Sequence, residues 1–313
     1  MQAAIVTAFD QPPHYGTVAE PVSQGPGEML VDVLAAGLHR LTRARASGVH
    51  YSSRGGLPLV PGVDGVGRGS DGKLRYFVQA PGPMGTMAER TVIELDHSIE
   101  LPADSDPVTL AGAMNPAMAS WLALRCRVPF RSGQKLLILG ATGSSGRMAV
   151  QIARHLGAAQ VIAAGRDERK LAQLPALGAT ETVTLADARL GGLAGEVDVV
   201  LDFLWGESAV RVMEAVLRQR ADRSRPLGWI HLGSMAGEVA AIPGAFLRSA
   251  NVQIMGSGLG AVSAGDILGA LPALAQEIAR GRLRIDLKAV PLRDVAQAWP
   301  AAADGGERIV FTP

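Results

Sequence analysis

The sequence contains very little cysteine and no strong excess of charge of either sign. Cys126 is the single cysteine among 313 residues, so no disulfide can form within the chain. The formal net charge is +1 and only 19% of the residues are charged, which leaves no basic surface of the extent that nucleic-acid binding requires. We therefore expect no nucleic acid as the primary partner, and the lone thiol suits the reducing conditions of the cytoplasm.

Long apolar runs are absent as well. No run reaches the roughly 20 apolar residues of a transmembrane helix, because Gly, Pro or charged residues interrupt the alanine-rich stretches. The first eight residues alternate as in a strand and do not form a basic region followed by the apolar core of a signal peptide. The sequence thus predicts a globular, cytoplasmic protein with no membrane partner.

A glycine-containing motif near the middle of the chain is the strongest functional signal. It follows an apolar run at 135–139 and precedes a helical pattern at 147–156. A helix N-terminus after such a turn presents unpaired backbone N–H groups and a partial positive charge, which suit a diphosphate. Ala141 replaces the first Gly of the usual fingerprint, so an ordinary strand–helix turn is the alternative. The motif comprises Gly140, Ala141, Thr142, Gly143, Ser144, Ser145 and Gly146.

A second apolar run at 160–164 bears on the choice of cofactor. In an NAD site this strand ends in an acidic residue that binds the ribose hydroxyls, whereas here it is followed by Gly165 and Arg166. Arg166 can bind a 2′-phosphate with two hydrogen bonds, and Lys170 can neutralise its charge from the next turn. The sequence predicts NADP (NADPH) as the cofactor, although these cations could instead form a solvated helix face with Arg169.

The pattern of elements changes near residue 116 and indicates two domains. Residues 1–115 are rich in Gly and Pro, with strand-like runs at 29–35, 74–79 and 87–93. From residue 116, apolar strands alternate with helices, which predicts an α/β fold with a doubly wound parallel sheet of the Rossmann type. The expected strands are 136–139, 161–164, 182–185, 197–202, 229–232 and 252–255.

The end of the chain is expected to return to the first domain. A helical stretch at 264–279 precedes a segment at 286–298 and a final strand at 308–311 that resemble the first region. We therefore expect one domain at residues 1–115, completed by about 265–313, and an NADP-binding Rossmann domain at residues 116–264.

An ordered series of short motifs resembles the medium-chain dehydrogenase/reductase superfamily, and within it the zinc-free branch of quinone oxidoreductases and enoyl reductases. The motifs lie at 35–38, 47–48, 61–67, 85–89, 149–153 and 308–310, in addition to the glycine turn. The resemblance implies a GroES-like, mainly β catalytic domain split around the Rossmann domain, with the active site between them. It also implies a homodimer formed through the strand at 252–255.

The resemblance further bears on metal binding. Zinc-dependent relatives have Cys at the position of His39, His-Glu at Val63-Asp64, and Cys at Asn115. A catalytic zinc needs three protein ligands, and Val63 cannot coordinate a metal. We therefore expect no metal.

Without a Lewis acid, hydride addition is easier to a conjugated acceptor, because the developing charge is delocalised and hydrogen-bond donors can stabilise it. The predicted function is NADPH-dependent, zinc-independent reduction of a quinone or α,β-unsaturated carbonyl. A zinc-free carbonyl reductase or alcohol dehydrogenase, and a non-enzymatic NADPH-binding protein, are the alternatives.

Candidate proton donors lie in the loop at 47–53, where the resemblance places a Tyr of the enoyl reductases. Tyr51 is favoured over His50, because a Tyr of ordinary pKa, about 10, is protonated at neutral pH. The alternative is that both rings only pack the loop.

Further cofactor contacts are expected from four residues. His39 falls where quinone reductases have an Asn near the nicotinamide, but it could be a structural histidine. Asn115 could bind the nicotinamide ribose, or cap a helix with Pro116 in its first turn. Gly233 and Ser234 follow a predicted strand, at the sheet edge where ligands bind.

Overall fold

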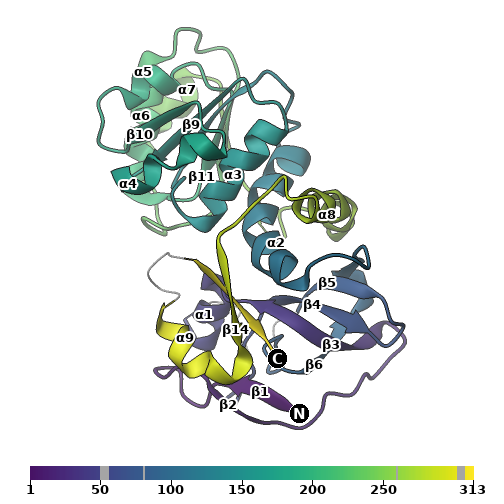
Figure 1. The fold of residues 1–313 in the computed structure, drawn as a ribbon. Helices are drawn as coiled ribbons and strands as arrows, with labels where there is room; N and C mark the ends of the chain where they lie inside the picture. The colour runs from purple at the N-terminus through teal and green to yellow at the C-terminus, as the bar shows by residue number, and fades with distance from the viewer. Residues whose placement is uncertain (50–55, 80–81, 259, 302–306) are drawn as a thin grey trace. The chain divides into compact units, whose positions relative to one another are not determined.

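The computed structural model describes residues 1–49, 56–79, 82–258, 260–301 and 307–313. The chain forms two compact units (Figure 1): one comprises Met1–Asn115 and Leu271–Pro313, and the other comprises Pro116–Ala270. The chain passes from one unit to the other within α2 (Pro107–Leu122) and α8 (Ala264–Ala279). The second boundary between the units, at Ala270 and Leu271, thus lies inside α8, whereas the boundary expected from the sequence was residue 264.

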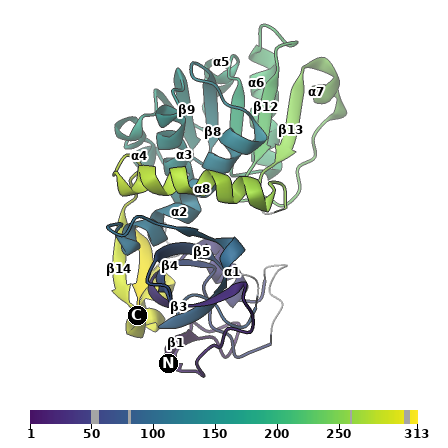
Figure 2. The same ribbon diagram turned by 90° about the vertical axis from the view of Figure 1, so that its right-hand side faces the viewer.

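The unit at 116–270 contains a six-stranded parallel sheet in the order β10-β9-β8-β11-β12-β13. The strand order reverses between β8 and β11, as in a doubly wound Rossmann fold, which confirms the predicted sheet. Figure 2 shows several of these strands side by side. Their bounds are β8 (Lys135–Leu139), β9 (Gln160–Gly165), β10 (Glu181–Thr184), β11 (Val199–Asp202), β12 (Leu227–His231) and β13 (Val252–Gly256).

Helices cover both faces of this sheet, which explains why its central strands β8, β9 and β11 are apolar along most of their length. Leu137, Val200 and Trp229 are buried against α5 and α6 on one face, while α3 packs on β8 and β9. The helices of this unit are α3 (Ser144–His155), α4 (Glu168–Leu171), α5 (Leu190–Ala194), α6 (Gly206–Gln219), α7 (Gly244–Ser249), the π-helix η2 (Ala123–Arg127) and the 3₁₀-helix η3 (Leu174–Leu177).

The other unit is mainly β. Its large sheet has the order β14-β15-β3-β4-β5-β7, with β6 paired to β3, and all pairs are antiparallel except β14 with β15. The strands are β1 (Gln2–Ile5), β2 (His14–Thr17), β3 (Glu28–Gly37), β4 (Asp64–Gly69), β5 (Leu74–Val78), β6 (Arg90–Glu94), β7 (Ser98–Glu100), β14 (Leu287–Pro291) and β15 (Arg308–Thr312). The short helices are α1 (Arg40–Ala46), η1 (Leu95–His97), η4 (Leu292–Asp294) and α9 (Val295–Ala301).

The start of α2 corrects one prediction. The helix begins at Pro107, and the Asp106 carboxylate accepts a hydrogen bond of 2.9 Å from the backbone N–H of Thr109. An acidic cap followed by Pro in the first helical position is a strong start signal. Asn115 and Pro116 therefore lie in the interior of the helix, and the hypothesis that Asn115 caps it is wrong.

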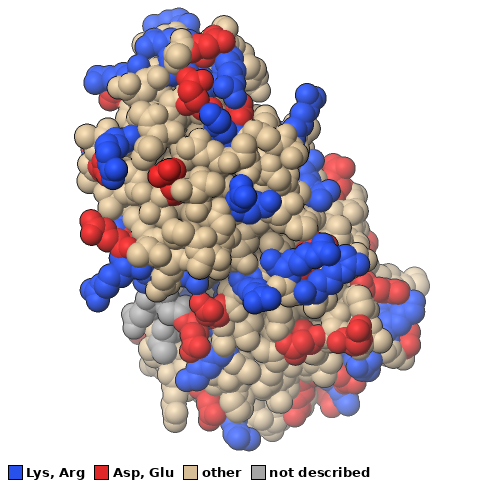
Figure 3. All heavy atoms as spheres, turned by 45° about the horizontal axis from the view of Figure 1, so that its top comes forward, with Lys and Arg blue, Asp and Glu red and all other residues tan. Residues whose placement is uncertain are grey.

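The surface agrees with a mixed charge distribution. On the face drawn in Figure 3, Asp and Glu side chains are interspersed with Lys and Arg side chains, and residues of other types cover most of the area. Among the described residues, no helix combines the length and the apolar character needed to cross a membrane.

Candidate functional site

The glycine turn connects β8 to α3 with little room for a side chain at Gly140 and Gly146. Gly140 has φ of 81°, and its N–H and that of Ala141 each donate to the Ala164 carbonyl at 3.0 Å. A Cβ on Gly146 would overlap the carbonyl oxygen of Gly140 and would lie 2.6 Å from Cα of Ala141. Gly146 thus allows the helix to start directly against the end of the central strand.

The first turn of α3 is open to a ligand. Gly143 is the N-cap residue, and it has no side chain that could accept hydrogen bonds from the first-turn amides. Gly143 is exposed, while Ser144 and Ser145 are half-buried. Uncapped N–H groups at the positive end of a 12-residue helix suit a phosphate.

The end of β9 presents a cation, and the Asp167 carboxylate beside it is occupied by backbone amides. A Cβ on Gly165 would lie 2.9 Å from Cγ2 of Thr142. The carboxylate of Asp167 caps α4, accepting from the N–H groups of Arg169 at 3.0 Å and Lys170 at 3.2 Å. Arg166 is exposed and makes no hydrogen bond or ion pair with any residue in the described ranges. These residues fit a 2′-phosphate better than they fit a pair of ribose hydroxyls.

The ends of β11 and β12 are joined by a buried carboxylate. Oδ1 of Asp202 accepts from the N–H groups of Leu204 at 2.8 Å and Trp205 at 3.0 Å, and Oδ2 accepts from Nε1 of Trp229 at 2.9 Å. Asp202 is completely buried, so it organises the turn after β11. Beyond β12, Oγ of Ser234 lies 3.4 Å from Nε2 of His231. The structure thus places Gly233 and Ser234 at the same sheet edge as the glycine turn.

His39 belongs to a buried hydrogen-bond network in the mainly β unit. Its Nε2 lies 3.0 Å from Oδ1 of Asp64, and the hydroxyl of Tyr76 donates to Oδ2 of Asp64 at 2.7 Å. Burial lowers the pKa of His39 from its ordinary value, although Asp64 opposes this change. Burial, reinforced by the negative charge of Asp64, raises the pKa of Tyr76 well above 10. The network favours a neutral imidazole and a protonated phenol.

The residues at the zinc-ligand positions do not fit a catalytic zinc. Both carboxylate oxygens of Asp64 accept hydrogen bonds from neighbouring side chains, Val63 is aliphatic, and Asn115 lies within α2. Such a site would have to break the His39–Asp64 contact and would still lack a third good ligand.

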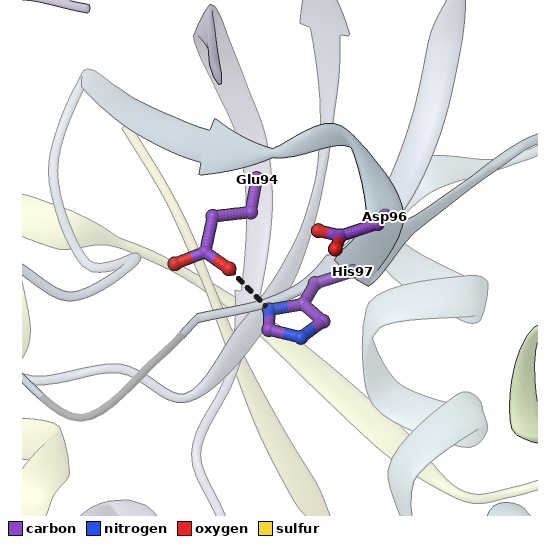
Figure 4. Close-up of side chains that lie close together, drawn as sticks. All are labelled: Glu94, Asp96 and His97. Carbon is purple, nitrogen blue, oxygen red and sulfur yellow. Dashed lines mark ion pairs between the residues drawn. The ribbon is translucent and has the colours of Figure 1, made fainter. Parts of the chain in front are cut away.

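One other group of possible metal ligands occurs in the described part of the chain. Glu94, Asp96 and His97 lie together at the end of β6 (Figure 4). All three are exposed, and Nδ1 of His97 is paired with Oε2 of Glu94 at 3.0 Å. Exposed groups of this kind are common in proteins without a metal, so this cluster does not indicate a catalytic centre.

Two predicted residues, His50 and Tyr51, lie outside the described residues. Two others that bear on the site were missed from the sequence. Tyr76 is brought to Asp64 by the pairing of β4 with β5, which no local pattern reveals. Trp205 has a positive φ that depends on its contacts with other segments of the chain. The only signal of it in the sequence is a bulky residue directly before Gly206.

Comparison with known proteins agrees with this geometry. The family model described as "Zinc-binding dehydrogenase" matches residues 146–276. The chain is 29% identical to "Probable NADPH-dependent quinone reductase tdiC" of Emericella nidulans over the full length of both proteins. It is 27% identical to "NADPH-dependent alkenal/one oxidoreductase, chloroplastic" of Arabidopsis thaliana, with 60% of this chain aligned to about half of that relative, 53%.

A solved structure supports the same relationship. The quinone oxidoreductase from Thermus thermophilus, described with its NADPH complex, is 27% identical, with a TM-score of 0.79 and complete coverage of both chains. The Rossmann sheet and the mainly β unit agree with these matches. The chain thus resembles the quinone oxidoreductase branch of the medium-chain dehydrogenase/reductase superfamily.

Proposed function

We propose that this protein is an NADPH-dependent oxidoreductase that reduces a quinone or an α,β-unsaturated carbonyl without zinc. The observation that carries the proposal is the pairing of two features at one edge of the sheet: the uncapped first turn of α3 and the exposed Arg166 at the end of β9. The relatives described above, named for quinone and alkenal/one substrates and for NADPH, support it.

The proposed cofactor contacts follow from the chemistry of each position. The amides of Ser144, Ser145 and Gly146 would hold the diphosphate. Arg166 would bind the 2′-phosphate, with Lys170 adding positive charge from α4. Gly233 and Ser234, together with His39 and Asn115, are proposed for the nicotinamide end. These assignments require that the dinucleotide crosses the sheet at the reversal between β8 and β11.

Bound NADPH would supply a hydride, and the protein would stabilise the charge that develops on the acceptor oxygen. In an enone or quinone this charge is delocalised, so hydrogen-bond donors suffice. We assign Tyr51, and in second place His50, as the donor of the proton. Since the donor set at His39, Val63 and Asp64 does not fit zinc, no metal-assisted step is included.

The test is a comparison of substrates by the purified protein with NADPH. An enone or quinone should be consumed faster than the matching saturated ketone, as measured by loss of NADPH absorbance. Faster consumption of the ketone would assign the protein as a zinc-free carbonyl reductase or alcohol dehydrogenase. Tight binding of NADPH with no turnover of quinones, enals or ketones would assign a non-enzymatic NADPH-binding protein.

We further propose that the protein is a cytoplasmic homodimer. In the described part of the sheet β13 pairs only with β12, which leaves its other edge available for the corresponding strand of a second copy. Sedimentation velocity should give about twice the mass of 32.5 kDa, and a species of 32.5 kDa at micromolar concentration would contradict the dimer.

The lone cysteine and the use of NADPH favour the cytoplasm as the location of the protein.

A further inference from the structure

Trp205 has a backbone conformation that ordinary residues avoid. Among the described residues it is the one non-glycine residue with positive φ, with φ of 54° and ψ of −163°. Only glycine adopts this region without strain, and strained residues cluster at ligand-binding sites where the surrounding structure enforces them. The neighbouring Gly206 also has positive φ, 65°. The strained conformation of Trp205 must therefore be enforced by contacts with other parts of the chain.

The surrounding structure enforces the conformation of Trp205 through backbone hydrogen bonds. Asp202 accepts from the N–H of Trp205 at 3.0 Å and from that of Leu204 at 2.8 Å. The carbonyl oxygen of Leu204 in turn accepts from the N–H of Ala236 at 2.7 Å. Because Asp202 is itself buried and bound by Trp229, the turn cannot relax without breaking the contacts that join β11 to β12.

The indole of Trp205 is positioned by a second ring. Its centroid lies 4.5 Å from that of the His231 imidazole, and the ring planes meet at 50°. His231 is the last residue of β12, and Ser234 contacts its Nε2. Trp205 also packs against the hydrophobic core of this unit and is half-buried, not fully buried. The side chain is thus held in one orientation while part of its surface stays accessible.

The location of this pair is the edge at which dinucleotides bind. The turn after β11 packs directly on the glycine turn, since a Cβ on Gly140 would lie 3.1 Å from Cδ2 of Leu204. β8 and β11 are the two strands between which the strand order reverses. Ligands of doubly wound sheets lie outside the carboxyl ends of the strands at this reversal.

We propose that Trp205, braced by His231, is a stacking surface for a flat heteroaromatic ring of the bound dinucleotide. The inference rests on the proposed NADPH site and adds a positioning residue to it. An indole face stacks well on such rings, and orientation by a second ring lowers the entropy lost on binding. The same chemistry would serve either the adenine or the nicotinamide ring, so the test includes a ligand for each.

The test compares two substitutions that keep a bulky apolar side chain, Trp205→Phe and Trp205→Leu. Dissociation constants are measured for NADPH, for adenosine 2′,5′-bisphosphate and for reduced nicotinamide mononucleotide. Trp205→Phe keeps a π face and should bind NADPH within about twofold of the unmodified protein, whereas Trp205→Leu should bind it about tenfold more weakly. A matching loss with the bisphosphate assigns the adenine ring, and a matching loss with the mononucleotide assigns the nicotinamide ring.

Unchanged affinity of Trp205→Leu for NADPH would overturn the inference. If the unmodified protein binds neither NADPH nor the bisphosphate, the proposed cofactor is wrong instead, so the two failures are distinguishable. Circular dichroism and thermal unfolding check that each variant is folded. Should Trp205→Leu not fold, Trp205→Gly is the second variant, because glycine adopts this backbone conformation without strain. Its affinity for NADPH should fall by a similar factor, and unchanged affinity would again overturn the inference.

Discussion

Neighbouring side chains at the end of β9 have different roles that follow from their hydrogen bonds. The carboxylate of Asp167 is occupied by the amides of α4, whereas the guanidinium of Arg166 has no partner among the described residues. Gly165 allows the strand to end against Thr142. At the scale of single residues, this arrangement explains how a chain with an acidic residue close to β9 can still favour a phosphorylated ribose.

Replacing Arg166 should alter coenzyme preference. In Arg166→Gln the dissociation constant for NADPH should rise about 10- to 100-fold, the value expected for a lost hydrogen bond to a charged group, while that for NADH should change little. Fluorescence titration with both coenzymes provides the measurement. Arg211→Gln is a matched control, because Arg211 is exposed on α6 and pairs with Glu207. An equal rise for both coenzymes would show that Arg166 does not contact the 2′-phosphate.

Substitution of His39 should change how stability depends on pH. Burial lowers the pKa of His39 in the folded protein below its ordinary value of 6.5, despite Asp64, and Arg308 and Arg45 act in the same direction as burial. Between the two pKa values the unfolded chain binds more protons, so this contribution to stability is present above pH 6.5 and is lost as the pH falls.

Urea denaturation of the unmodified protein and of His39→Gln tests this expectation. Between pH 7.5 and pH 5.5, both within the range in which an ordinary histidine titrates, the unmodified protein should lose more unfolding free energy. The extra loss has an upper limit of about 1.4 kcal/mol per pH unit for one group. Parallel pH profiles for the two proteins would indicate that His39 is not held neutral by burial.

At the scale of elements, the junction of β8 and α3 determines whether the phosphate turn can form. Gly146 and Gly143 belong to the same motif but occupy different environments. A Cβ on Gly146 would meet the backbone of Gly140 and Ala141, while the nearest atom to a Cβ on Gly143 is 3.8 Å away. Gly146 is therefore needed for folding of the junction, whereas Gly143 leaves space on the side proposed for the ligand.

Alanine substitutions should separate these two roles. Gly146→Ala should lose about 1–3 kcal/mol of unfolding free energy through overpacking and should also bind NADPH weakly. Gly143→Ala should keep its stability within about 0.5 kcal/mol, since φ of −77° suits alanine, but should still weaken NADPH binding. Thermal unfolding and coenzyme titration of both variants provide the comparison. Equal stability losses would contradict the packing argument.

The parallel sheet was the part of the fold most accessible from sequence. Its central strands are short apolar runs because helices bury both faces of the sheet, and that signal is local. The start of α2 is also signalled locally, by Asp106 followed by Pro107. The later helix start considered from the sequence, at Asn115 and Pro116, did not use this signal. The positive φ of Trp205 depends on Asp202 and on hydrogen bonds from residues beyond β12, so no local pattern could reveal it.

At the scale of the whole molecule, the chain combines a Rossmann unit with a mainly β unit in which His39 and Asp64 belong to a buried hydrogen-bond network. The contacts of Asp64 with His39 and Tyr76 are buried and use both carboxylate oxygens. The sequence singled out His39 and Asp64 as positions of zinc ligands in relatives. It did not reveal their contact with Tyr76, because that contact depends on the pairing of β4 with β5 in the folded state.

Removal of metal should therefore leave activity intact. After dialysis against EDTA, the protein should contain less than stoichiometric zinc, as measured by atomic emission, and should reduce its substrate at an unchanged rate with NADPH. Added zinc should not increase the rate. One tightly bound zinc per chain, whose loss abolishes turnover and whose return restores it, would show that a catalytic zinc binds despite the poor set of ligands.

The close approach of Gly165 to Thr142 limits how coenzyme preference can change by mutation. An acidic side chain at position 165 has to share space with the methyl group of Thr142, 2.9 Å from where its Cβ would lie. The two positions are therefore coupled, and the order of substitution matters. Conversion toward NADH has to begin with a smaller residue at position 142, because the acidic replacement made first damages the protein before it offers any benefit.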